Sequence, residues 1–219
     1  MHPALLHHLR QRSTDMMQPR DPVPPLGRMM VFVDGENIVA RFQAMLAEGR
    51  KPTSHVAHRV DTYAWSEYAV WPGLNVVQRC TYYTYTTGDQ SSIDHVSAEL
   101  RALRFRQYSL IGQNFTSYLH SNLYPKVFWK QKKRSGKGVD IQMTVDVLTN
   151  VYQNNLDVVF LVTGDGDFAP LIQEAQRMGK QVVVAALSSG LSEHLKITTD
   201  VFHDLDDIFF ESPSEQNAA

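Results

Sequence analysis

Four aspartates stand where a predicted strand ends or a predicted helix begins: Asp34, Asp140, Asp165 and Asp167. Carboxylate oxygens are hard ligands of the kind that Mg²⁺ and Mn²⁺ prefer. Several carboxylates packed together repel one another unless a cation neutralises them. The pattern therefore predicts a site for Mg²⁺ or Mn²⁺, although each acid taken alone also fits a helix cap or a turn.

Two further polar side chains are catalytic candidates beside these acids. Asn37, three residues after Asp34, carries an amide that can orient a bound water or a phosphate, and it also fits a helix N-cap. Asp146 lies six residues after Asp140, about 120° further round a helix, so the two share an edge only loosely. A hydrogen-bonding or solvated role is the alternative for Asp146.

A basic segment leads into the helix of Asp140, with its cations at Lys130, Lys132, Lys133, Arg134 and Lys137. A run of charge is usually a solvated surface, but beside metal-binding acids it predicts contact with a polyanionic backbone. Aromatic residues that can stack bases occur at Tyr82, Tyr83, Tyr85, Phe128 and Trp129. In strands such residues more often belong to the core or the sheet surface.

The elements that must position these residues alternate between strands and helices. Strands are predicted at about 29–34, 76–86, 108–111, 126–132, 158–162, 182–187 and 201–203. Helices are predicted at 38–48, from a cap at Ser91 or Ser92 to 103, and at 140–152, 168–178 and 192–196, with 50–75 assigned loosely as helical. This alternation predicts an α/β fold with a parallel sheet, in which the carboxyl ends of the strands share one edge.

Composition and length predict one domain with short appendages. The first 27 residues show no period and predict a mobile extension before a domain at 28–210 and a polar tail at 211–219. The net charge of -2 neither favours nor excludes nucleic acid, and the single cysteine, Cys80, is predicted to be buried in a strand. With no secretory signal and no apolar run near the ~20 residues needed to span a bilayer, we expect a cytoplasmic protein without membrane contact.

Three blocks of the sequence resemble the signature blocks of one family. They read VFVDGEN, KGVDIQMTVDVL and LVTGDGDFAPLIQEAQRMGKQVVV in this order. They are similar to those of NYN domains, the LabA/DUF88-like branch of the PIN-like nuclease superfamily, over about 29–205. The resemblance implies a three-layer α/β/α PIN-like sandwich whose central, mainly parallel sheet has the strand order 3-2-1-4-5, and a Mg²⁺-dependent endoribonuclease site.

Carried over by position, the family's metal-binding acids are Asp34, Asp140, Asp165 and Asp167. Asn37 matches the polar residue of the DGxN block, and Asp146 matches the second acid of the KGVD block. The basic segment is then expected to bind RNA, single-stranded or structured. The chain departs from the family in Glu36, in Thr163 where Ser is frequent, and in an insertion at 112–130. The oligomeric state stays open, with a homodimer as one alternative.

Other classes of protein are alternatives to a nuclease. A phosphatase of the haloacid dehalogenase type needs Asp-x-Asp after its first strand, whereas Gly35 and Glu36 follow Asp34 here. A dinucleotide-binding domain needs GxGxxG after that strand, and the chain has none there. A non-catalytic RNA-binding or scaffold module with the same fold would not need its acids, which are all present.

Overall fold

The computed structural model describes residues 27–73, 75–110, 116–129 and 137–212. Most of the predicted extension at 1–27 and most of the predicted tail at 211–219 lie outside these residues, so both assignments stay predictions. No helix within the described ranges is long and apolar enough to cross a membrane.

A six-stranded sheet forms the centre of the molecule, in the order β10-β9-β8-β1-β4-β7. Its strands are β1 (Arg28–Asp34), β4 (Val76–Thr86), β7 (Tyr124–Trp129), β8 (Val158–Val162), β9 (Gln181–Ala186) and β10 (Val201–Asp204). Every neighbouring pair is parallel. Counted along the chain, the order is 3-2-1-4-5 with β10 as a sixth strand at the edge, which confirms the predicted parallel sheet and its order.

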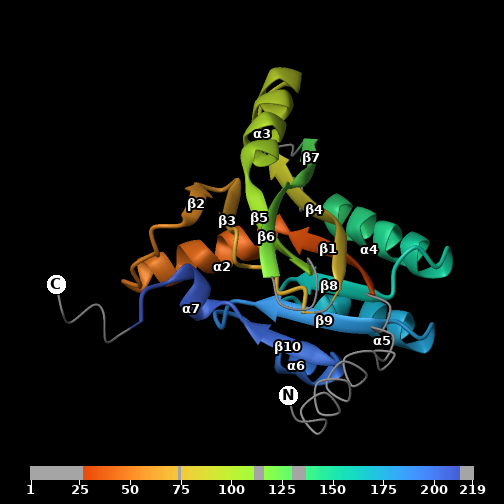
Figure 1. The fold of residues 1–219 in the computed structure, drawn as a ribbon. Coiled ribbons are helices and arrows are strands. Elements are labelled where there is room, and N and C mark those ends of the chain that lie inside the picture. Colours follow the sequence, from red (N-terminus) through yellow and green to blue (C-terminus); the bar gives the residue numbers. More distant parts are fainter. Residues whose placement is uncertain (1–26, 74, 111–115, 130–136, 213–219) are drawn as a thin grey trace, which may run out of the picture.

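Helices cover both faces of this sheet because successive strand residues point to opposite sides. Val31 and Val33 face one hydrophobic core, and Phe32 faces the other. On the first face lie α2 (Gly35–Ala47), α3 (Gln90–Ala102) and α7 (Asp206–Phe209), and on the second lie α4 (Lys137–Tyr152), α5 (Ala169–Arg177) and α6 (Glu193–Thr198). Two cores on either side of one sheet confirm the three-layer α/β/α architecture (Figure 1).

Residues 50–75 are not helical as predicted. They form an antiparallel pair, β2 (Val56–Arg59) and β3 (Tyr63–Ser66), beside α2. Trp65 is only 2% exposed, and its indole N–H donates to the Arg104 carbonyl at 2.8 Å. Trp65 and Tyr63 therefore pack on the first core from a strand, and the loose helical spacing of this segment was misleading.

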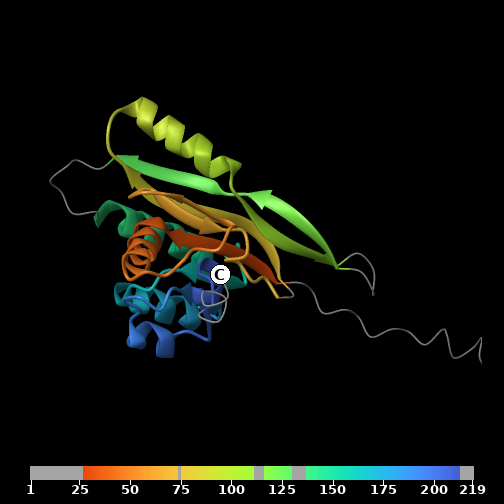
Figure 2. The same cartoon turned by 90° about the vertical axis from the view of Figure 1, so that its left-hand side faces the viewer.

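The predicted strand at 108–111 does not occupy the third position of the main sheet. It belongs to β5 (Arg104–Leu110), which pairs antiparallel with β6 (Thr116–Asn122) in a separate hairpin. The third position is taken by β7, the described part of the strand predicted at 126–132. This hairpin and α3 lie on the β4–β7 side of the molecule, away from β9 and β10 (Figure 2).

The start of α3 also differs from the prediction. Asp89, rather than Ser91 or Ser92, is its N-cap, and its carboxylate accepts from the Ser92 backbone N–H at 3.1 Å. Cys80 is 1% exposed in β4, as predicted, and burial raises the pKa of its thiol well above the ordinary value.

Candidate active site

The candidate site begins at the carboxyl ends of two neighbouring strands, β1 and β8. These strands pair in parallel with Val33 opposite Val162, so Asp34 and the loop from Thr163 onward leave the sheet side by side. In open α/β sheets this edge is where ligands bind. Parallel pairing thus brings together acids that lie about 130 positions apart in the sequence.

Asp34 is the buried centre of the site, with 3% of its surface exposed. Its Oδ1 accepts from the Asn37 backbone N–H at 3.0 Å, which makes Asp34 the N-cap of α2. Its Oδ2 accepts from the Thr163 hydroxyl at 2.9 Å. The carboxylate is therefore held in one orientation by a helix on one side and by the neighbouring strand on the other.

The loop after β8 is tied to α2 by side-chain hydrogen bonds. The Asn37 side-chain oxygen accepts from Gly164 N at 2.9 Å, and the Thr163 hydroxyl accepts from Asp165 N at 3.1 Å. Asp165 in turn caps the short 3₁₀ turn η2 (Gly166–Phe168), because its Oδ1 accepts from Asp167 N at 2.9 Å. Asn37 thus positions the loop that carries two of the acids.

Two glycines of the motifs are required by close approach of other atoms. A Cβ at Gly35 would lie 2.4 Å from the Tyr83 carbonyl oxygen, so no larger residue fits where α2 starts against β4. A Cβ at Gly166 would lie 2.7 Å from Ser192 Oγ. The glycines of DGEN and GDGDF therefore permit tight packing of the loops around the acids.

Asp140 completes the group from the other face of the sheet. It lies in the first turn of α4, which starts at Lys137, three residues before the predicted start. It lines a pocket of about 240 Å³ together with Thr144, Asp165 and Asp167. The structure thus brings Asp140, Asp165 and Asp167 to one hollow beside Asp34.

The electrostatics of these acids show mutual repulsion. Burial, together with the charges of Asp140 and Asp165, raises the pKa of Asp34 to about 6, against the opposing effect of its two hydrogen bonds. Desolvation of the Asp140 carboxyl group raises its pKa too, as do the charges of Glu36, Asp165 and Asp167. Within the described ranges none of the four predicted metal ligands forms a salt bridge, so no protein cation pairs directly with these carboxylates.

Comparison with known families matches residues 28–206 to the NYN domain. This chain belongs to the NYN domain family. The family is part of the PIN-like superfamily, and its members are generally nucleases that use divalent metal ions. The match supports a hydrolytic enzyme with a nuclease-like fold.

Two individual proteins are also similar to this NYN domain. A segment of 70 residues is 37% identical to uncharacterized protein MJ0482 of Methanocaldococcus jannaschii, and it covers 32% of this chain and only 29% of that relative. The crystal structure of VPA0982, a protein of unknown function from Vibrio parahaemolyticus, aligns with a TM-score of 0.57 at 21% identity, over 87% of this chain and 99% of that one. At this identity the second likeness shows the fold alone.

Asp146 has different neighbours in the NYN domain. Its Oδ2 accepts from the Tyr83 hydroxyl and from Lys126 Nζ, both at 2.5 Å, and its Oδ1 accepts from Gln142 at 3.0 Å. Burial alone would raise the pKa of Asp146, but these hydrogen bonds and the Lys126 charge together lower it. The structure therefore gives this candidate a contact set that includes none of the four other acids.

The remaining candidates are placed as follows. The basic residues Lys130, Lys132, Lys133 and Arg134 lie outside the described residues, and Lys137 is described only by its backbone at the start of α4. Among the aromatic candidates, Tyr82, Tyr83 and Tyr85 are buried and Trp129 is 53% exposed. Of these candidates, Trp129 thus offers an accessible ring, held by its indole N–H on the Gly88 carbonyl at 2.7 Å.

The donor set of the NYN domain fits a hard divalent cation by its chemistry, since every group is a carboxylate oxygen and the charges repel. Each oxygen of Asp34 keeps a lone pair beyond its one hydrogen bond. The part of the chain that the structure describes holds no three acids already gathered into a ligand sphere. Small side-chain movements would accompany binding.

Glu36 was not predicted as a member of the site, and Tyr85 was named only as an aromatic residue that can stack bases or belong to the core. Glu36 lies two residues after Asp34, and its charge raises the pKa of Asp140. Tyr85 reaches the same helix, because its hydroxyl accepts from Val139 N at 2.9 Å. The position of Glu36 within DGEN was a usable signal, whereas the contact of Tyr85 depends on how α4 packs on β4.

Proposed function

We propose that this NYN domain is an endoribonuclease that hydrolyses RNA phosphodiester bonds with Mg²⁺ or Mn²⁺. The observation that carries the proposal is the buried Asp34, whose pKa is raised to about 6 among like charges without a salt bridge in the described ranges. Such an arrangement is unfavourable for the protein alone and becomes favourable when a cation binds. The NYN family assignment supports the same reading.

The residues that would hold the metal are Asp34, Asp140, Asp165 and Asp167. A bound divalent ion would polarise the phosphate and lower the pKa of an attacking water. Thr163 and Asn37 hold the acids in position. Thr163 donates to the Asp34 carboxylate, and Asn37 accepts from Gly164 N in the loop that leads to Asp165. Asp140 and Asp167 line the open hollow, where their carboxylates can accept protons from water.

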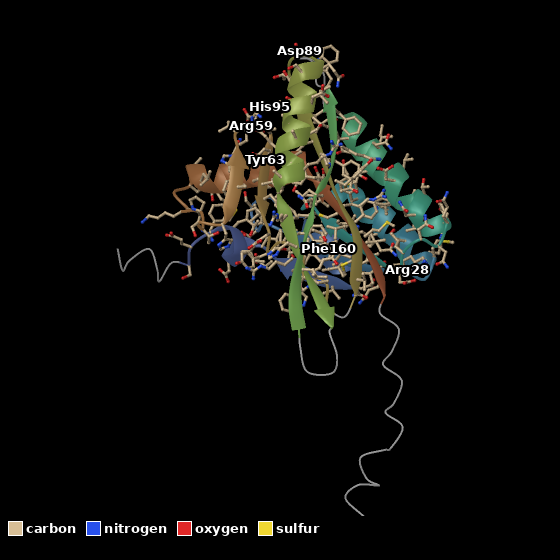
Figure 3. The ribbon with its side chains drawn as sticks, turned by 45° about the horizontal axis from the view of Figure 1, so that its top comes forward. Arg28, Arg59, Tyr63, Asp89, His95 and Phe160 are labelled. Carbon is tan, nitrogen blue, oxygen red and sulfur yellow. The ribbon has the colours of Figure 1, made fainter. Side chains whose placement is uncertain are left out.

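The surface beside the acids has room for a nucleotide of the strand. A pocket of about 620 Å³ is lined by Glu36, whose charge acts on Asp140, and by hydroxyl residues such as Thr86 and Ser92. Arg59 from β2 and His95 from α3 lie close together on its wall, each paired with Glu99 (Figure 3). A polar pocket of this size suits the sugar and phosphate of RNA, and the basic segment at 130–137 would hold the backbone nearby.

The test is incubation of the chain with labelled single-stranded and structured RNAs, with Mg²⁺, Mn²⁺ or EDTA. We expect metal-dependent internal cleavage that Asp165→Asn abolishes and Glu48→Gln preserves. Glu48 is an exposed acid at the far end of α2, so its substitution removes the same charge outside the site. Full activity of Asp165→Asn would overturn the assignment.

The second candidate function is an RNA-binding module without catalysis. It is favoured by the lack of a preformed three-acid metal sphere in the described residues. RNA binding that is unchanged by EDTA and yields no product with either metal would establish it.

A further inference from the structure

Arg41 is a cation beside the acid group that the proposed chemistry does not yet use. It lies on α2, four residues after Asn37, so the two side chains project from the same side of the helix. Asn37 faces the loop after β8, through its bond to Gly164 N. Arg41 faces the next loop, after β9, where its guanidinium meets Gly190.

The guanidinium group is seated closely on this turn. A Cβ at Gly190 would lie 2.2 Å from the Arg41 guanidinium carbon and 2.6 Å from Nε, and the φ of Gly190 is +63°. The positive φ favours glycine, since a larger residue would strain the backbone, and any Cβ at this position would also displace the arginine. The turn therefore leaves room for the Arg41 guanidinium to lie against its backbone.

The loop that contacts this guanidinium lies beside the loop that leads to Asp165, because Ser192 N donates to the Gly164 carbonyl at 3.0 Å. A Cβ at Gly164 would lie 3.5 Å from both the Asn37 side-chain oxygen and the Leu191 Cα. Leu191 follows Gly190, and Asp165 follows Gly164. Arg41 thus contacts the loop after β9, which adjoins the loop that carries Asp165, while the pocket that contains Glu36 lies on the β4 side.

The hydrogen-bond donors of Arg41 are unused within the described residues. Its Nε is buried without a partner, and it forms no salt bridge there. In contrast, Arg28 pairs with Asp157 and Arg50 with Asp206. A guanidinium that is paired with no carboxylate in the described ranges has its terminal N–H groups available for an incoming anion.

We propose that Arg41 and the Gly190 turn form a phosphate-binding site for the RNA strand, next to the bond that is cut. The inference rests on the proposed function for its choice of ligand. A guanidinium presents planar donors that match two phosphate oxygens, and it stays charged at every working pH. Arg41 then positions the strand, while the acids act at the neighbouring phosphate.

The test measures RNA binding separately from cleavage. A labelled single-stranded RNA is titrated in EDTA at several salt concentrations with the wild type, Arg41→Gln, Arg41→Lys, Gly190→Ala and Arg177→Gln. Arg177 is the matched control, because it is an exposed arginine at the end of α5. Thermal unfolding of each variant confirms that it is folded.

We expect Arg41→Gln to weaken binding about tenfold and to lower the salt slope by about 0.7, the loss of one phosphate contact on a single strand. Arg41→Lys should recover part of the affinity and most of the slope. Gly190→Ala should weaken binding with no change in net charge. An Arg41→Gln protein with the affinity and slope of Arg177→Gln would overturn the inference.

The two proposals fail in distinguishable ways. If the wild type cuts RNA but its binding does not depend on Arg41, the phosphate site is wrong and the nuclease assignment stands. If no RNA is cut but binding depends on Arg41 as expected, the site is supported and the catalytic assignment fails.

Discussion

Two aspartates on the same helix, Asp140 and Asp146, lie in opposite electrostatic environments. Desolvation and the charges of Glu36, Asp165 and Asp167 raise the pKa of Asp140. At Asp146 the desolvation is outweighed by the hydrogen bonds of Lys126, Tyr83 and Gln142, and the pKa falls. The first acid faces other acids, and the second has a cation and a hydroxyl as direct partners.

The charge of Asp146 is compensated by partners within the protein. The charge of Asp140 has no such partner among the described residues, so we expect a bound cation to compensate it. A charge paired inside the fold adds to stability, whereas like charges gathered at a sheet edge reduce it until a cation binds. We therefore expect substitutions in the two regions to have opposite effects on activity and stability. Four measurements test this contrast.

The largest effect is expected for Asp34→Asn. The amide keeps the shape and its oxygen can still accept from Asn37 N, while its NH2 would donate to the Thr163 hydroxyl in place of accepting from it. The charge is lost, so cleavage should fall by about a thousandfold. The raised pKa corresponds to a cost on the order of 3 kcal/mol for the buried charge. Because the variant avoids this cost, its free energy of unfolding without metal at pH 7 should be higher by about 1–3 kcal/mol. The measurements are cleavage rate and urea denaturation; a less stable variant would contradict this account.

The pH dependence of metal binding should follow the same carboxylate. Because the folded pKa of Asp34 is about 6, protons compete with the metal as the pH falls through this value. We expect the affinity for Mg²⁺ to fall on the order of tenfold for each pH unit below 6. Isothermal titration calorimetry at several pH values measures this. Without metal, the stability gain of Asp34→Asn should be complete above pH 6 and absent below the unfolded pKa of 3.8. A pH-independent gain would refute the link to this carboxyl group.

Asp146→Asn should have the reverse profile of Asp34→Asn. It leaves Lys126 without its counter-ion at a half-buried position, so we expect a loss of about 1–2 kcal/mol in unfolding free energy at pH 7. Because the carboxyl pKa is lowered in the fold, this contribution is present above pH 3.8 and disappears at lower pH. Metal-dependent cleavage should persist. Loss of cleavage at unchanged stability would place Asp146 in the catalytic group.

The smallest effect is expected for Tyr83→Phe. The change removes the buried hydroxyl that donates to Asp146 and keeps the ring in the second core. A single such hydrogen bond contributes about 1 kcal/mol, so thermal unfolding should shift slightly downward with cleavage unchanged. A drop in cleavage without a change in unfolding would mean that the two acid environments are coupled.

Much of the candidate site at the edge of the sheet could be predicted from the sequence. An apolar strand ending in Asp34 and another ending in Thr163 and Gly164 indicate a buried parallel sheet, and such a sheet collects its strand ends at one edge. Asp34 and the loop with Asp165 and Asp167 follow from this rule, whereas Asp140 was expected from the start of its predicted helix. The family resemblance of the same blocks supplied the strand order, which the structure confirms.

Residues 50–75 and 104–122 could not be predicted in the same way. Both form antiparallel hairpins beside the main sheet, and their aromatic and polar residues satisfy neither a helical nor a strand period clearly. Their conformation depends on partners far along the chain, such as the Arg104 carbonyl that accepts from Trp65.

The sequence by itself determined the parallel core and the acids at its edge, because strand and helix periods are local properties of the chain. Tertiary structure alone decided which charges meet. It gave Asp146 the partners Lys126 and Tyr83, which Asp140 lacks, and it placed the guanidinium of Arg41 against Gly190. The pKa of a carboxyl group depends on the groups that surround it in space. Helical spacing predicts such neighbours only within a single helix.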